Sequence, residues 1–119
     1  MIMTGMMDNI FPLPMTSTAA YYLLRRFNIE ADLIYIDAGH EHEEVYTDLS
    51  LYYELLRPGG IMVCDDYIPG WPGVVSAINK FVAEKRLAMT AFQAKCAFAK
   101  PLQGGQIEEA RQPTVSLVA

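Results

Sequence analysis

Three aspartates stand directly after two short apolar runs of the sequence. Asp37 follows the run 33–36, whereas Asp65 and Asp66 follow the run 61–64. Carboxylates that share a few ångströms of space cannot comfortably all ionise unless a cation compensates their charge. Carboxylate oxygens favour magnesium, manganese or calcium over zinc. If the two runs lie side by side, the aspartates are predicted to form a Mg²⁺ site; the alternative is that they cap the following segments and bind nothing.

Two histidines and two aromatic residues lie close to these aspartates in the sequence. His40 and His42 come just after the first run, and a neutral imidazole at His40 could act as a general base. The alternative is a solvated histidine pair at the start of a helix. Tyr67 and Trp71 follow Asp66, where they could form the wall of a substrate pocket or pack over the edge of a sheet. Both pairs of alternatives stay open at the level of sequence.

The elements that position these residues follow from the apolar pattern. The runs 33–37 and 61–65 have the continuous apolar character of strands buried on both faces. Between them, apolar residues recur at helical spacing, which predicts a helix over about 42–57 that ends at the Pro-Gly-Gly of 58–60. A strand, a helix and a strand joined by short linkers form a βαβ unit with parallel strands. The carboxyl ends of the two strands should therefore meet at one rim, where ligands bind in open α/β sheets.

The other elements flank this unit. They are a short strand over 10–13, a helix over 18–28, a loop over 67–73, a helix over 74–86, and two strands near 88–93 and 95–99. After Pro101 the chain turns polar and gains glycine. We therefore expect one α/β domain over residues 1–101 and a loose C-terminal tail over 102–119, whose apolar end at 115–118 could dock on a neighbour.

Composition limits the function classes. The chain has 119 residues, enough for one domain, and is 52% hydrophobic and 19% charged, as expected for a globular protein. Nine basic and fourteen acidic residues give a net charge of -5, which opposes binding to nucleic acid. The two cysteines lie in apolar runs, which is typical of buried reduced thiols and predicts a cytoplasmic protein. No segment has the pattern of a signal peptide or a membrane span, so no membrane partner is expected.

Several motifs, in this order and at this spacing, resemble the class I S-adenosylmethionine-dependent methyltransferases. They are Ile-Asp-Ala-Gly-His at 36–40, Leu-Arg-Pro-Gly-Gly at 56–60, Asp-Asp-Tyr at 65–67, and Trp-Pro-Gly-Val at 71–74. The resemblance is greatest to the bacterial sugar O-methyltransferases and more distant to catechol O-methyltransferase. It covers about residues 10–100. The implied fold is α/β, a partial Rossmann-like sheet of parallel strands with a C-terminal antiparallel hairpin that lacks the first two strands of the family.

The resemblance implies methyl transfer from S-adenosylmethionine to an oxygen of a small hydroxylated acceptor. In that family Mg²⁺ is often held by acids that match Asp37, Asp65 and Asp66. His40 and Asp37 would then be the catalytic residues, and Tyr67 and Trp71 would line the substrate pocket. The implied cofactor-binding residues are Met15, Thr16, Ser17, Asp37 and Ala38.

Two departures from the family pattern bear on activity. Gly39 stands where the sugar methyltransferases often carry a second acid, so the role of base passes to His40 or is lost. The glycine-rich turn after the family's first strand and the acidic end of its second strand are missing, and no Gly-x-Gly-x-Gly run occurs in the sequence. The family's first strand pairs with its fourth, which here is 33–37. That strand would become an exposed apolar edge, so we expect a homo-oligomer formed through it, or coverage of the edge by segment 10–14.

Three functions stay open. The first is an S-adenosylmethionine-dependent O-methyltransferase, and the second is a non-catalytic self-associating module or a fragment of a longer methyltransferase, inactive alone without the glycine-rich loop. The third is a receiver-like domain that binds magnesium and a phosphoryl group. It is disfavoured because no lysine is expected near the strand ends. The lysines expected elsewhere are Lys80, Lys85, Lys95 and Lys100.

Overall fold

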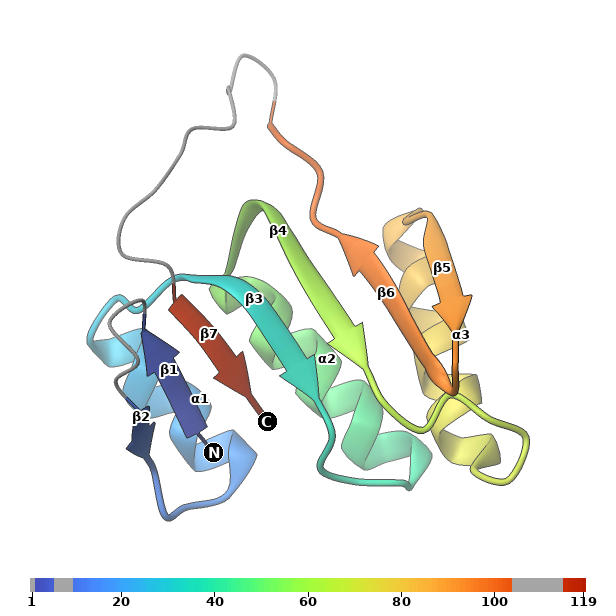
Figure 1. Cartoon of the computed structure of the whole chain (residues 1–119), viewed down its shortest axis with the longest axis horizontal. Coiled ribbons are helices and arrows are strands. Elements are labelled where there is room, and N and C mark those ends of the chain that lie inside the picture. Colours follow the sequence, from blue (N-terminus) through green and yellow to red (C-terminus); the bar gives the residue numbers. More distant parts are fainter. Residues whose placement is uncertain (1, 6–9, 104–114) are drawn as a thin grey trace.

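The computed structural model describes residues 2–5, 10–103 and 115–119 (Figure 1). These residues form one seven-stranded sheet in the order β2-β1-β7-β3-β4-β6-β5. Its strands are β1 (Ile2–Gly5), β2 (Ile10–Pro12), β3 (Ala31–Ile36), β4 (Leu56–Cys64), β5 (Met89–Phe92), β6 (Lys95–Ala99) and β7 (Val115–Val118). The helices are α1 (Ser17–Arg26), α2 (His42–Leu55) and α3 (Pro72–Lys85). None of the described helices is long and apolar enough to cross a membrane.

The centre of the sheet is the predicted βαβ unit. β3 and β4 are parallel, with Leu33 opposite Ile61 and Ile36 opposite Cys64. β6 runs antiparallel to β4 and forms a hairpin with β5. The parallel strands and the C-terminal antiparallel hairpin therefore agree with the expected α/β architecture.

The described helices lie on one face of the sheet, so the structure has two layers (Figure 1). Ile34 and Met62 are buried under the helices, whereas their sequence neighbours Leu33 and Ile61 are 38% and 46% exposed. The expectation that both strands are buried on both faces is therefore wrong for the described chain. A continuous apolar run shows that a strand is central, but it does not show that a second layer covers it.

The loose tail expected over 102–119 is wrong for its last residues. Val115–Val118 forms β7, which pairs in parallel with β3 and antiparallel with β1. The backbone continues this pairing, because Ala119 N–H donates to the Tyr35 carbonyl at 2.8 Å and Asp37 N–H donates to the Ala119 carbonyl at 2.6 Å. Residues 104–114 of the expected tail lie outside the described part of the chain.

The pairing of β7 also corrects the expected free edge. β3 lies inside the sheet between β7 and β4, so it offers no open edge through which a second copy could pair. Segment 10–14 does not cover β3 either, since β2 pairs with β1 at the far side of the sheet. The structure thus removes the reason for expecting a homo-oligomer formed through strand 33–37.

Candidate functional site

The carboxyl ends of β3 and β4 lie side by side, as the βαβ unit requires. Asp65 N–H donates to the Ile36 carbonyl at 3.0 Å, which ties the residue after β4 to the end of β3. Asp66 has φ of 60°, a left-handed conformation that turns the chain away from the strand direction. The three aspartates therefore lie at one rim of the sheet. The carboxylates of Asp65 and Asp66 take different partners.

Asp65 is the most strongly engaged of the three carboxylates. Its Oδ2 accepts a hydrogen bond from the Tyr35 hydroxyl at 2.7 Å. Its Oδ1 accepts from the Lys95 ammonium at 3.1 Å and from the backbone N–H of Asp66 at 2.8 Å. The Tyr35 hydrogen bond above all, helped by the Asp66 amide and Lys95, holds the pKa of Asp65 below its usual range. Asp65 is thus a charged carboxylate with an internal cation beside it.

Asp37 experiences the opposite environment. Partial desolvation raises the pKa of its carboxyl group, and the negative charges of Asp65 and Asp66 raise it further. His40 and, to a smaller extent, Lys95 act in the other direction and lower the pKa of Asp37. The charged groups of the rim therefore act on one another.

His40 is held between an acid and an aromatic ring. Its Nε2 lies 2.8 Å from Asp66 Oδ2, and its ring stacks on Trp71 with centroids 3.9 Å apart and planes 10° from parallel. Gly73 brings the start of α3 close to this loop, because a Cβ at that position would lie 2.6 Å from the His40 carbonyl oxygen. The carboxylate and the stacked ring together fix the orientation of the imidazole.

The two predicted pocket aromatics have different surroundings. Tyr67 helps to line a mostly apolar hollow of about 550 Å³ between the loop after β4 and the first turns of α3. Its hydroxyl donates to Asn79 Oδ1 at 2.6 Å. Trp71 is not among the residues that line this hollow, and its close partner is His40. Tyr67 therefore borders a hollow and Trp71 does not, and a substrate-pocket role stays a prediction for both.

A second cavity, of about 480 Å³, lies between the starts of α1 and α2. It brings together hydroxyl groups of α1, the turn after β3, and acids of α2; the lining residues are Thr16, Ser17, Thr18, Ala38, Gly39, Glu43, Glu44, Thr47 and Asp48. Three of the predicted cofactor residues are in this set, namely Thr16, Ser17 and Ala38. Met15 and Asp37 are not among the lining residues, although each directly precedes one of them in the chain.

Sequence reasoning missed Asp48, which closes one side of this cavity. Its carboxylate accepts a hydrogen bond from the Ser17 hydroxyl at 2.7 Å. Only 5% of Asp48 is exposed, and desolvation raises the pKa of its carboxyl group. The signal was present in the sequence, because Asp48 falls on the same helical face as the buried Val45 and Tyr52.

Lys95 was also missed, and its predicted position away from the strand ends is wrong. It is the first residue of β6, and β6 runs antiparallel to β4, so the start of one strand lies beside the end of the other. Cys96 pairs with Cys64, which places the preceding Lys95 opposite the following Asp65. The lysine is thus placed by the register between β4 and β6, which neither strand shows alone.

The three aspartates do not form the predicted metal site in this structure. Within residues 2–5, 10–103 and 115–119, no three or more His, Cys, Asp or Glu side chains are placed to hold a metal ion. Asp65 directs both oxygens at protein donors, one of which is the Lys95 ammonium. Because this donor set does not fit a divalent cation, no catalytic step is assigned to a metal.

Comparisons with known proteins bear on the domain type and the fold rather than on the individual site residues. The family model described as "Methyltransferase domain" matches residues 4–67. The uncharacterized protein R132 of Acanthamoeba polyphaga mimivirus is 42% identical over 55 residues, which are 44% of this chain and 25% of that protein. Among solved structures, an O-methyltransferase from Bacillus cereus in complex with SAH is 20% identical with a TM-score of 0.56, over 71% of this chain and 48% of that one.

A second solved structure extends the fold comparison. The MycE methyltransferase from the mycinamycin biosynthetic pathway, in complex with Mg and SAH, is 17% identical with a TM-score of 0.56, over 78% of this chain and 31% of that one. The chain therefore spans less than half the length of each of these three proteins. The two structural matches confirm the expected partial Rossmann-like fold.

Proposed function

The chain belongs to the methyltransferase-domain family, and from this premise we propose that it binds S-adenosylmethionine and transfers the methyl group to an oxygen of a small hydroxylated acceptor. The observation that carries the proposal is the cavity between α1 and α2. Thr16, Ser17 and Ala38 were expected from the sequence to contact the cofactor, and all three line it. The cavity also lies beyond the carboxyl end of β3, where ligands bind in open α/β sheets.

The lining of the cavity suits a nucleoside that carries a cationic group. Hydroxyl groups of Thr16 and Ser17 can donate to or accept from ribose and base atoms. The carboxylates of Glu43 and Glu44 line the same cavity and would favour a positive charge. Because the Thr16 hydroxyl also accepts from the Ala19 N–H at 3.1 Å, the start of α1 is fixed before any ligand arrives.

In the proposed reaction His40 is the base, and Asp66 and Trp71 are its positioning residues. Asp66 engages the Nε2 nitrogen, which leaves Nδ1 as the nitrogen that would take the proton of the acceptor hydroxyl. S-adenosylmethionine supplies the methyl group: the new oxygen–carbon bond forms as the sulfur–carbon bond breaks, and the bonding electron pair stays on sulfur. The Trp71 ring holds the imidazole plane in one orientation while the proton moves.

One observation favours the second candidate, a non-catalytic module or an incomplete methyltransferase. No glycine-rich turn of the Gly-x-Gly-x-Gly type occurs in the 119 residues, and the position beside β3 is filled by β7, whose sequence is Val-Ser-Leu-Val. Such a turn lets the backbone approach the cofactor closely in dinucleotide-type sites. The proposed binding therefore rests on α1, α2 and the turn after β3.

Isothermal titration of S-adenosylmethionine and S-adenosylhomocysteine into the purified chain separates the two candidates. Micromolar binding is expected, and Ala38→Trp should weaken it at least about tenfold by filling the cavity. Ala91→Trp provides the matched control, because Ala91 is an exposed residue of β5 outside the cavity and its replacement should leave binding unchanged. Absence of heat at millimolar ligand would favour the non-catalytic module, whereas equal binding by both variants would exclude the proposed site.

A further inference from the structure

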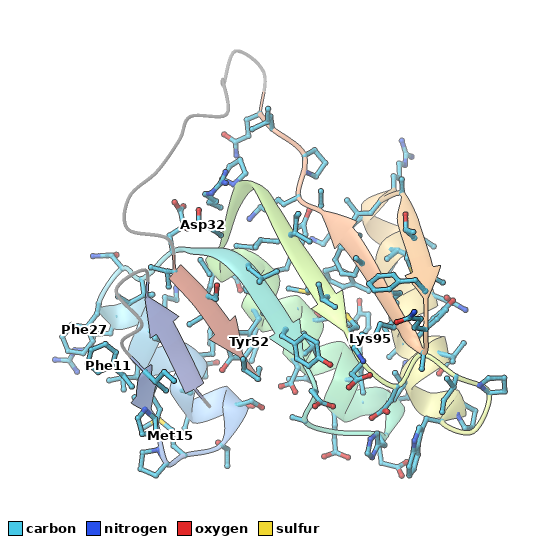
Figure 2. All side chains as sticks on the ribbon, viewed as in Figure 1. Phe11, Met15, Phe27, Asp32, Tyr52 and Lys95 are labelled. Atoms are coloured by element: carbon cyan, nitrogen blue, oxygen red, sulfur yellow. The ribbon has the colours of Figure 1, made fainter. Side chains whose placement is uncertain are left out.

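The acidic rim already contains a cation that belongs to the protein. Lys95 stands at the start of β6, beside the end of β4 (Figure 2), and its Nζ lies 3.1 Å from Asp65 Oδ1. The side chains of both residues are mostly covered, 35% and 21% exposed respectively, so water screens the pair less than an open surface pair. The antiparallel register of β4 and β6, in which Cys64 pairs with Cys96, places Lys95 opposite Asp65, so the backbone as well as the flexible side chain determines this position.

The same contacts leave Asp65 poorly suited to a metal. A carboxylate has about four lone-pair positions, and Asp65 already accepts from Tyr35, Lys95 and the backbone of Asp66. A divalent cation at Asp65 would stand beside the ammonium of Lys95, so two positive charges would repel each other at short range. Lys95 and a metal therefore compete for the same carboxylate.

We propose that Lys95 is the built-in counter-cation of the rim, so that Asp65 is held by lysine instead of by a divalent metal. Lys95 then has two effects, because it balances the charge of Asp65 and lies close enough to act on Asp37 as well. This role is independent of the proposed binding of S-adenosylmethionine, since it concerns only the metal affinity of the rim. Removal of the ammonium should convert the three aspartates into a cation site.

The test uses Mn²⁺ as the probe, followed by electron paramagnetic resonance of the free ion and by the thermal midpoint of the whole chain. Lys95→Met should bind Mn²⁺ at least about tenfold more tightly than the natural sequence, and adding Asp65→Asn should remove the gain. Lys95→Gln keeps a hydrogen-bond donor without the charge and should behave like Lys95→Met if the latter folds poorly. Lys80→Met is the control, because Lys80 packs over Tyr46 and its loss should change nothing at the rim.

Two results would overturn the proposal. The first is tight Mn²⁺ binding by the natural sequence that Lys95→Met does not increase, which would mean that lysine and metal do not compete. The second is weak binding by the natural sequence and equally weak binding by folded Lys95→Met and Lys95→Gln. That outcome would show that the aspartates do not gather around a cation even without the ammonium. Neither readout depends on whether S-adenosylmethionine binds, so failure here leaves the proposed function to its own test.

Discussion

Replacing Leu117 with alanine tests whether β7 is a structural strand of this sheet. Leu117 lies opposite Ile34 of β3, and its side chain is 0% exposed among the core residues. In a loose tail the same substitution would cost almost nothing, because no buried contact would be lost. The two arrangements therefore differ in the free energy of unfolding and can be distinguished without any ligand.

The expected loss is large relative to the stability of a small domain. Leucine-to-alanine substitutions in cores cost about 2.7–5 kcal/mol, from lost apolar burial and from the cavity that remains. β7 is a short strand with room to relax, so we expect about 2–4 kcal/mol for Leu117→Ala. With a urea dependence of about 2 kcal/mol per molar, which is typical of a small domain, this loss lowers the unfolding midpoint by about 1–2 M.

Urea unfolding followed by far-ultraviolet circular dichroism gives the measurement. Leu102→Ala is the matched control, since Leu102 is 43% exposed and should shift the free energy by no more than about 0.5 kcal/mol. Amide exchange gives an independent check, because the β3 amides that face β7 should be protected in the natural sequence. If both leucine variants unfold at the same urea concentration and β3 exchanges rapidly, the assignment of β7 is refuted.

Two further predictions concern the cavity and the loop that holds His40. Burial raises the pKa of Asp48, so between its ordinary and raised pKa the folded state binds more protons than the unfolded state, and stability falls as pH rises through this window. Asp48→Asn should flatten the pH dependence of the free energy of unfolding, measured by urea unfolding from about pH 4 to pH 7. At neutral pH the variant should be at least as stable as the natural sequence, and a clear loss of stability there would contradict the reasoning. Gly73→Ala places a Cβ 2.6 Å from the His40 carbonyl oxygen, so it should cost about 1–3 kcal/mol and change the emission of Trp71, the single tryptophan. Gly70→Ala, with its nearest contact at 3.8 Å, should do neither, and equal behaviour of the two glycine variants would exclude the steric explanation.

The sequence predicted the centre of the fold because local signals there agree with one another. The runs that became β3 and β4 are apolar and end in aspartate, and the helix between them has a regular apolar face. The strands of a βαβ unit are parallel, so their carboxyl ends, and with them Asp37 and Asp65, were expected at one rim. Thr16, Ser17 and Ala38 were expected near the cofactor from the resemblance to the methyltransferases, not from the pattern of the elements.

What the sequence did not predict depends on pairing between distant segments. β7 lies about 80 residues after β3, and a four-residue apolar segment has no signal that names its partner strand. The sequence indicated both an exposed edge at β3 and an apolar segment at 115–118. It did not indicate that the two pair with each other. The position of Lys95 was missed for a related reason, since it depends on the register between β4 and β6 rather than on either strand alone.

In the methyltransferases that this chain resembles, the strand at the position of β7 meets two requirements. The strand beside β3 must complete the backbone hydrogen bonds of a central parallel strand, and almost any short apolar segment can do this because the bonding groups are the same in every residue. The same strand must also lead into a glycine-rich turn that approaches the cofactor, which requires particular residues. Val115–Val118 meets the first requirement through its pairing with Leu33–Tyr35. The backbone pairing of β7 therefore says nothing about cofactor binding, and the proposed binding rests on the cavity that residues of α1, α2 and the turn after β3 line.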